Sequence, residues 1–316
     1  MADAHPRHLL GVSDLTRDDA ERILDTATAL ERSLDREMKK LPTLRGRPVV
    51  NLFYESSTRT LSSFELAAKR LSADTMVLRA SGSSVDKGES LRDTALTLAA
   101  YDPDVIVIRH PHIGAPQLVV AATEAHVVNA GDGKHQHPTQ ALLDLHTIRN
   151  ALGRLDGVTV AIVGDVLHSR VARSLVEALL LVGAEPVLIA PPTLLPRDVE
   201  ALGATVSHSI DSLPDADVVY VLRMQAERME ASYVPSLREY TALYGVTPDR
   251  VRPGQVVMHP GPMNRGVEID PRVADSGASL VTTQVRSGLV VRMAVLYDLL
   301  TAPGLHVASA PVMEVA

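Results

Sequence analysis

The chain has 316 residues, and because single domains commonly contain about 150 residues, this length predicts two domains. Lys and Arg total 31 against 38 Asp and Glu, so the net charge of −7 argues against a general nucleic-acid or anionic-membrane binder. The absence of Cys excludes disulfides, thiolate metal sites and cysteine nucleophiles, and two Phe, seven Tyr and no Trp argue against a base-stacking platform.

Short apolar runs alternate with helical patterns along the first half of the chain. The predicted strands are 48–53, 76–78, 105–108 and 127–129. The predicted helices are 18–37, 60–71, 90–100, 115–125 and a further helix that begins at Pro138, where a missing N–H costs nothing. This alternation of strands and helices predicts a parallel α/β sheet.

A second series of the same kind follows. Its predicted strands are 158–163, 186–190, 217–222 and 255–258, with helices at 170–182, 235–244 and 287–300. We therefore expect an α/β protein of two domains, each a parallel sheet flanked by helices, with helices between the domains. The expected division is 1–152, with the last helix (about 287–302) packing back on it, then 153–286, and a tail at 303–316.

The segment from Ser57 to Thr60 (Ser-Thr-Arg-Thr) lies where the strand 48–53 ends and a helix begins. A helix N-terminus presents free N–H groups and the positive end of the helix dipole, so it favours anions. The hydroxyls of Ser57, Thr58 and Thr60 and the planar fork of Arg59 would add donors suited to phosphate. The alternative is that Ser57 or Thr58 only caps the helix.

Further polar motifs follow other predicted strands. Arg109 ends one strand, and His137 and Gln140 follow the next, so Arg59, Arg109, His137 and Gln140 are expected to converge at the carboxyl edge of the sheet. The polar segment 81–90 could be a loop that delivers Lys87 to an anion, or only a solvated loop. His135 and His137 have metal-like spacing but no third ligand, so we expect no metal.

The second half repeats this arrangement. Gly164 follows a strand, but the residues after it do not complete the G-x-G-x-x-G fingerprint of a dinucleotide site. Arg170 begins a helix after the same strand and could bind a carboxylate, as could Arg223 and Gln225 at the end of another strand, although either arginine could instead form a surface ion pair. The glycine-punctuated loop 258–266 either presents carbonyls to a ligand or is a simple turn.

Taken in this order, the motifs resemble those of the transcarbamoylase (aspartate/ornithine carbamoyltransferase) family over nearly the whole chain. The family's S-T-R-T, R-H-P and H-P-T-Q motifs appear at 57–60, 109–111 and 137–140. The Lys87-Gly88-Glu89 loop, Arg223-x-Gln225 and the His-Pro-Gly-Pro at 259–262 resemble the aspartate-specific branch. The ornithine-specific branch is expected to carry His-Cys-Leu-Pro and Ser-Met-Gly, and this sequence contains neither. Leu61 and His135 depart from the Arg and Asn that are common in the family.

The resemblance implies transfer of the carbamoyl group of carbamoyl phosphate to the amine of L-aspartate in pyrimidine (UMP) synthesis, without a cofactor. It implies catalytic roles for Arg59, Arg109, His137 and Lys87, and a cis bond between Gly261 and Pro262. The implied carbamoyl phosphate ligands are Ser57, Thr58, Arg59, Thr60, Arg109, His137, Gln140, Gly261 and Pro262. The implied aspartate ligands are Lys87, Arg170, Arg223 and Gln225, with Ser83 and Lys87 supplied by a neighbouring subunit.

The resemblance also implies a homotrimer, which could assemble further with regulatory chains or a dihydroorotase. The N-terminal segment lacks the features of a signal peptide and no apolar run approaches about 18 residues, so we expect a cytoplasmic protein that binds neither membrane nor nucleic acid. Two alternatives remain at this point: a transcarbamoylase for another amine acceptor, or a member of the family that binds ligand without catalysis.

Overall fold

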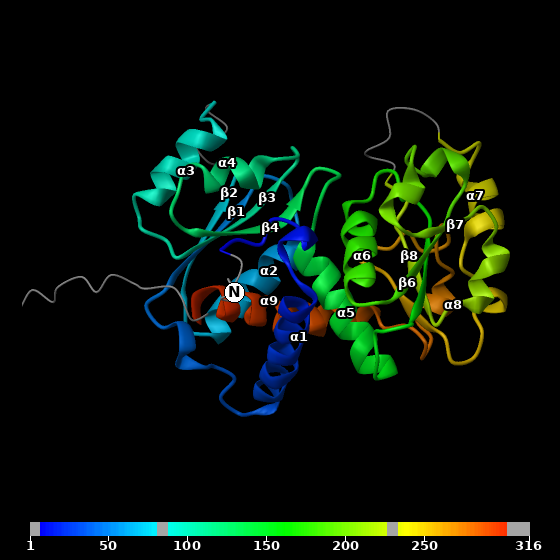
Figure 1. The fold of residues 1–316 in the computed structure, drawn as a ribbon, viewed down its shortest axis with the longest axis horizontal. Coiled ribbons are helices and arrows are strands. Elements are labelled where there is room, and N and C mark those ends of the chain that lie inside the picture. Colours follow the sequence, from blue (N-terminus) through cyan, green and yellow to red (C-terminus); the bar gives the residue numbers. More distant parts are fainter. Residues whose placement is uncertain (1–6, 81–87, 226–232, 302–316) are drawn as a thin grey trace, which may run out of the picture.

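Two parallel β-sheets, each flanked by helices, occupy the left and right halves of the molecule in Figure 1. The structure is a computed structural model that describes residues 7–80, 88–225 and 233–301. The predicted α/β fold class, with two parallel sheets, is confirmed. The first half of the chain forms one sheet and the second half forms the other.

The first sheet has the strand order β2-β1-β3-β4. Its strands are β1 (Pro48–Phe53), β2 (Asp74–Arg79), β3 (Val105–His110) and β4 (His126–Asp132). Alternate side chains point to opposite faces, so Val49 packs toward α1 (Arg17–Glu31) and α2 (Thr58–Arg70), whereas Val50 packs toward α3 (Leu91–Ala99) and α4 (Ala115–Val120). Helices on both faces explain why β1, β3 and β4 are buried along almost their whole length.

The second sheet has the strand order β7-β6-β5-β8-β9. Its strands are β5 (Thr159–Val163), β6 (Glu185–Ile189), β7 (Thr205–Ser207), β8 (Val218–Val221) and β9 (Val256–Met258). The helices of this half are α6 (Arg170–Leu181), α7 (Leu237–Tyr244) and α8 (Pro271–Ala274). The central strands β5 and β8 are buried and share one apolar core with α6 and α7.

Helices α5 (Pro138–Leu152) and α9 (Val281–Thr301) connect the two halves. Helix α5 lies between the sheets in Figure 1 and packs against α1, α6 and α9, while α9 packs against α1, α2 and α5. Proline at the first turn begins α5, and Gly153, in the left-handed conformation at φ +75°, ends it. Most of α5 is buried, so side chains on it can reach both sheets.

Several boundaries differ from the sequence prediction. The helix expected at 115–125 ends at Val120, and the Thr123 hydroxyl accepts a hydrogen bond from Ala125 N beyond it, a local turn that competes with helix. The helix expected at 18–37 ends at Glu31 and continues as a 3-10 turn. The last helix begins at Val281, six residues earlier than expected, because its β-branched first turn obscures the helical pattern. Strand β7 and helix α8 were not predicted.

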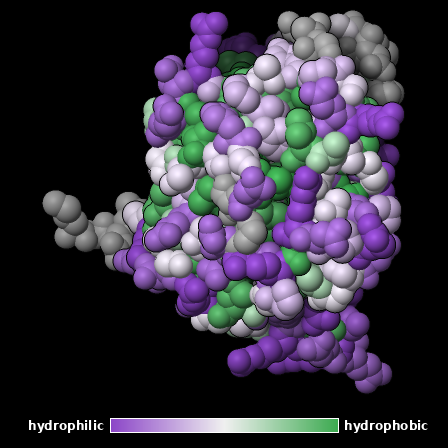
Figure 2. Space-filling view, turned by 90° about the vertical axis from the view of Figure 1, so that its right-hand side faces the viewer, coloured by the Kyte–Doolittle hydropathy of each residue, from purple (hydrophilic) through white to green (hydrophobic). Residues whose placement is uncertain are grey.

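The surface of the second half mixes hydrophilic and apolar side chains on the face shown in Figure 2. Across residues 7–80, 88–225 and 233–301, none of the helices is both long and apolar enough to cross a membrane.

Candidate active site

A cavity of about 670 Å³ lies where the carboxyl ends of both sheets face each other. Its walls come from the end of β3, from the segments that follow β1, β5, β8 and β9, from the beginnings of α2, α5 and α6, and from α9. Parallel pairing places these ends together, because Phe53 of β1 pairs with Arg109 of β3, and Val163 of β5 pairs with Val221 of β8. The cavity therefore occupies the position where open α/β sheets commonly bind ligands.

The N-terminus of α2 forms one wall of this cavity. Ser57 is the N-cap, and its hydroxyl accepts a hydrogen bond from Thr60 N at 3.4 Å. Arg59 lines the cavity, and its guanidinium forms no hydrogen bond or ion pair with another described residue. Burial and the nearby charge of Arg223 lower the pKa of Arg59 from its ordinary value, so the two positive charges repel each other within the cavity. An anion bound at this helix N-terminus would relieve that repulsion.

Glu55 joins two arginines of the cavity. Its Oε2 lies 3.1 Å from Arg109 Nε and 2.6 Å from Arg170 Nη2. The same arginines also donate to backbone carbonyls, Arg109 to Ala130 O at 3.3 Å and Arg170 to Gly133 O at 3.0 Å. Sequence reasoning assigned Glu55 no role, although an acidic residue directly before a cationic motif at a strand end was a usable signal.

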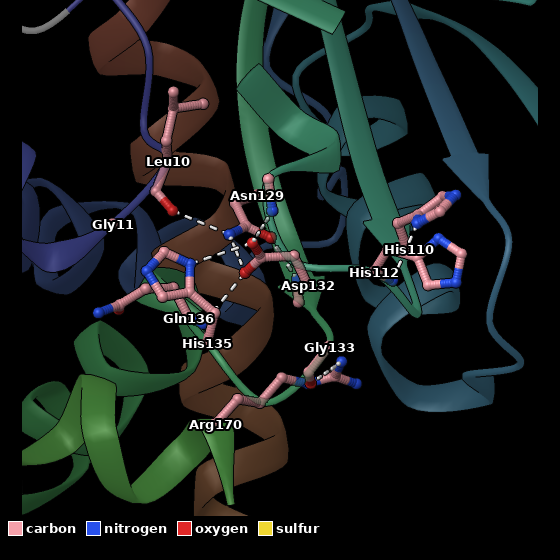
Figure 3. Close-up of polar contacts among 12 residues, drawn as sticks. Leu10, Gly11, His110, His112, Asn129, Asp132, Gly133, His135, Gln136 and Arg170 are labelled. Carbon is pink, nitrogen blue, oxygen red and sulfur yellow. Dashed lines mark hydrogen bonds and ion pairs between the residues drawn. The ribbon is translucent and has the colours of Figure 1, made fainter. Parts of the chain in front are cut away.

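The loop between β4 and α5 is built around the fully buried carboxylate of Asp132 (Figure 3). Asp132 Oδ1 accepts hydrogen bonds from Asn129 Nδ2 at 2.8 Å and Gln136 N at 3.0 Å. Its Oδ2 accepts from Gly114 N and lies 3.1 Å from His135 Nδ1. Figure 3 shows Arg170 reaching Gly133 at the end of this loop. These contacts fix the turn that positions the start of α5 and the carbonyl that holds Arg170.

His137 lies at the N-cap of α5 with only 3% of its surface exposed. Its backbone N–H donates to Ser174 Oγ at 2.8 Å, and Nδ1 has no hydrogen-bond partner among the described residues. Burial, reinforced by the positive charges of Arg109, Arg292 and Arg170, holds the pKa of His137 well below its ordinary value. The ring is therefore neutral near pH 7 and lines the cavity as a hydrogen-bonding group.

The segments after β8 and β9 form the opposite wall. Arg223 and Gln225 follow β8, and Gln225 N donates to Asp165 Oδ2 at 3.1 Å. After β9, the Gly261–Pro262 bond is cis, which confirms that prediction. Gly261 has φ +63°, and a Cβ there would lie 3.0 Å from Arg59 Cζ, so glycine lets this loop approach the guanidinium closely.

Every predicted site residue that the structure describes lines this one cavity. The set comprises Ser57, Thr58, Arg59, Thr60, Arg109, His137, Gln140, Arg170, Arg223, Gln225, Gly261 and Pro262. Ser83 and Lys87 lie outside the described residues. Of the two departures from the family pattern, Leu61 is buried in the apolar core under α2, and His135 contacts Asp132.

The sequence analysis did not identify two polar cavity residues on α9. Gln284 and Arg292 both line the cavity and are 4% exposed. Arg292 Nη1 donates to Gly288 O, its guanidinium lies 5.1 Å from the centre of the Phe64 ring, and burial lowers its pKa to about 10. No local sequence signal marks a buried cation in a helix that forms a long apolar core.

The charge balance of the cavity favours anions. Among its described lining residues, Arg59, Arg109, Arg170, Arg223, Arg265 and Arg292 are cations, and Glu55 is the carboxylate. Low-dielectric walls strengthen such a field for small ligands while the acidic overall charge repels polyanions. The arrangement is suited to hold two small anionic substrates side by side and to donate hydrogen bonds to an oxygen between them.

Profiles of known families match both halves of the chain. Residues 7–150 match the aspartate/ornithine carbamoyltransferase carbamoyl-P binding domain, and residues 156–299 match the Asp/Orn binding domain of the same family. Among curated relatives, the aspartate carbamoyltransferase catalytic subunit of Acidothermus cellulolyticus is 60% identical over 93% of this chain and 92% of the relative. The corresponding subunit of Thermobifida fusca is 58% identical over 93% of this chain and 95% of the relative.

Solved structures of similar chains have the same fold. Aspartate transcarbamoylase from Trypanosoma cruzi, in complex with N-(phosphonacetyl)-L-aspartic acid, superposes with a TM-score of 0.85 at 32% identity, covering 94% of this chain and 97% of that one. The catalytic subunit of M. jannaschii aspartate transcarbamoylase superposes with a TM-score of 0.82 at 39% identity, covering 93% and 98%. The similarity therefore extends over both sheets and the helices between them.

Proposed function

The chain belongs to the aspartate/ornithine carbamoyltransferase family, and we propose on that premise that its cavity transfers the carbamoyl group of carbamoyl phosphate to L-aspartate. The chain is a carbamoyltransferase. The aspartate nitrogen forms a bond to the carbonyl carbon, and the bond from that carbon to the phosphate oxygen breaks. The products are N-carbamoyl-L-aspartate and phosphate, in the synthesis of pyrimidines. The observation that carries this function is one cavity lined both by Arg59, at a helix N-terminus of the first half, and by Arg223, which follows β8 of the second half.

The phosphate is assigned to the α2 wall. Ser57, Thr58 and Thr60 would supply hydroxyl and backbone donors at the helix N-terminus, and Arg59 would bind the phosphate oxygens. The absence of another described partner for Arg59 supports this assignment.

The carbamoyl group is assigned to the α5 wall. His137, neutral and without a described partner at Nδ1, would hydrogen-bond the carbonyl oxygen together with Arg109. Gln140 and the carbonyl region of Gly261 and Pro262 would bind the carbamoyl amide. Donors aimed at an oxygen that gains negative charge stabilise the transition state more than the ground state.

Aspartate is assigned to the second half of the chain. Arg170, Arg223 and Gln225 would bind its two carboxylates, and Ser83 and Lys87 of a neighbouring copy would complete the site. Alignment of two bound substrates can lower the barrier by about 7–11 kcal/mol, so positioning and charge stabilisation suffice without a covalent nucleophile. The departing phosphate would accept the amine proton.

We propose that the chain acts as a homotrimer in the cytoplasm, with 1–152 and the last helix as the carbamoyl phosphate domain and 153–286 as the aspartate domain. Strand β2 is an edge strand, and its Met76 and Val77 side chains are 40% and 36% exposed, a surface that a second copy could cover. Ser83 and Lys87 follow β2 directly in the sequence. Two family profiles that divide the chain between 150 and 156 support the two domains.

The test is formation of carbamoyl aspartate by the purified protein, with ornithine and other amines as alternative acceptors. Aspartate should be carbamoylated and ornithine should not. Turnover of a different acceptor alone would contradict the assignment. Mixed oligomers of Lys87→Ala and Arg59→Ala subunits should regain activity, because one shared site would again be intact; verified hybrids without activity would contradict the shared site.

A further inference from the structure

A buried carboxylate lies directly behind the residue that we assign to the carbamoyl amide. Asp144 is one helical turn after Gln140 on α5, and its side chain is fully buried. Gln140 Nε2 donates to Asp144 Oδ1 at 3.1 Å and lies 3.3 Å from Oδ2. An i, i+4 pair of this kind faces the same side of a helix, so Asp144 supports Gln140 from within the same element.

Two further donors reach the same carboxylate from other elements. Gln284 Nε2 of α9 donates to Asp144 Oδ1 at 2.8 Å, and the Tyr220 hydroxyl of β8 donates to Oδ2 at 2.7 Å. Tyr220 is fully buried and Gln284 is 4% exposed. Asp144 therefore connects α5, α9 and the second sheet through one pair of oxygens.

When Asp144 is ionised, its carboxylate can only accept hydrogen bonds, so each glutamine then turns its NH₂ group toward it. For Gln140, which lines the cavity, this leaves the carbonyl Oε1 as the end available to a ligand. A carbonyl oxygen can accept a hydrogen bond from the carbamoyl NH₂ group. The reversed amide would present N–H groups to N–H groups and would repel it.

The orientation of Gln284 is transmitted to the loop after β9. With its NH₂ group on Asp144, the carbonyl Oε1 of Gln284 faces the other way and accepts from His259 N at 2.9 Å. His259 Nδ1 in turn accepts from Gly261 N at 2.8 Å. In each of these contacts the N–H group that is nearer the loop donates and the partner that is nearer Asp144 accepts, so hydrogen-bond donation runs from the loop that carries Pro262 toward Asp144.

We propose that Asp144 is a positioning residue that orients the Gln140 carboxamide toward the carbamoyl group and, through Gln284, holds the 259–262 loop at the same ligand. The proposal rests on the proposed function, because the ligand of Gln140 is the carbamoyl amide. Asp144 does not itself contact substrate. It acts by fixing which end of each amide faces the cavity.

The experiment is a double-mutant cycle with Asp144→Leu and Gln140→Ala, assayed at pH 8.5. Leucine is similar in size to aspartate but cannot accept hydrogen bonds, so Asp144→Leu leaves all three donors without this partner. We expect kcat/KM for carbamoyl phosphate to fall about 10- to 100-fold. Gln140→Ala should cause a similar loss. The kcat/KM of the double variant should be no lower than that of the less active single variant, because Asp144 acts through Gln140. Additive losses would overturn the proposal.

Three measurements separate positioning from a general structural role. Binding of inorganic phosphate, measured by calorimetry, should change by less than about twofold in Asp144→Leu, because phosphate is assigned to α2. Asp144→Asn should recover most of the activity, since its Oδ1 can still accept from both glutamines while the Tyr220 hydroxyl rotates to accept. The control Asp298→Leu removes a buried carboxylate that pairs with Arg22, away from the cavity, and should keep the wild-type KM for carbamoyl phosphate.

The outcomes distinguish this proposal from the proposed function. A wild-type protein that forms no carbamoyl aspartate refutes the function itself. An active wild type with an additive cycle, or with phosphate binding lost together with activity, refutes only the role of Asp144. If Asp144→Leu does not fold, Asp144→Ala replaces it in the cycle, and failure of both to fold would assign Asp144 to folding and overturn the proposal.

Discussion

Gly131 is the position at which a single methyl group should disturb the proposed aspartate site. It lies in β4 with φ +118°, and a Cβ built there would come 2.8 Å from Arg170 Nε and 2.9 Å from Cζ. Arg170 is 4% exposed and donates to Gly133 O at 3.0 Å and to Glu55 Oε2 at 2.6 Å. The guanidinium therefore cannot move away from an alanine at 131 without losing these contacts.

The magnitude follows from two costs. A side chain in this backbone region costs about 1–3 kcal/mol of stability. Displacement of Arg170 removes a hydrogen bond to a charged group, which contributes about 1.5–3 kcal/mol. The backbone cost lowers the stability of the protein, whereas the displacement of Arg170 weakens aspartate binding. Because about 1.4 kcal/mol corresponds to a factor of ten, the second cost should raise KM for aspartate about 10- to 100-fold in Gly131→Ala.

Steady-state kinetics with aspartate as the varied substrate, together with the melting temperature, tests this prediction. Gly254→Ala is the matched control, since Gly254 has φ +90° and a Cβ there would meet nothing within 4 Å. The control should lower the melting temperature but leave KM for aspartate unchanged. A wild-type KM in Gly131→Ala, or an equal increase in Gly254→Ala, would show that contact with Arg170 does not set the affinity for aspartate.

Three other predictions concern the phosphate wall, a buried acid and the loop before α5. Arg59→Ala should lower kcat/KM by about 100-fold or more, as the loss of a transition-state donor does; normal turnover in a coupled phosphate-release assay would contradict the phosphate role. Burial raises the pKa of Asp144 from 3.8 to about 7. Between these pH values the Asp144 side chain is ionised in the unfolded state but protonated in the native state, so the free energy of unfolding falls as the pH rises toward 7. Calorimetry should show Asp144→Asn gaining about 2 kcal/mol relative to wild type between pH 5.5 and 7, and a constant difference would exclude the raised pKa. Asp132→Ala should destabilise the protein by about 2–4 kcal/mol, because it leaves several buried donors unsatisfied, and an unchanged melting temperature would refute this.

Strands of continuous apolar residues were predictable because their signal is local. The strand 48–53 has the predicted bounds in the structure, and its β-branched run explains why. Strand β7 (Thr205–Ser207) was missed because it has only three residues, two of them polar, and so short a segment shows no periodicity. Helix α8 (Pro271–Ala274), a single turn, was missed for the same reason.

The convergence of the cavity residues was also predictable in outline. Arg59, Arg109 and His137 each lie at the end of a strand or the beginning of a helix, and parallel strands end at one edge of a sheet. The orientation of the two sheets toward one shared cavity depends on α5 and α9, which pack between elements far apart in the sequence. The resemblance of the motifs, not their spacing, indicated that both halves form one site.

Local sequence is enough to specify the alternation of strands and helices, the helix caps and the cationic motifs, since each depends on residues only a few positions apart. The partners of the buried polar groups, in contrast, depend on how distant segments pack together. Asp144 meets Tyr220 across 76 positions and Gln284 across 140, and Glu55 meets Arg170 across 115. A buried charge must find its donors wherever packing brings them, so the contacts that orient Gln140 and Arg170 are set by the packing of both sheets on α5 and α9.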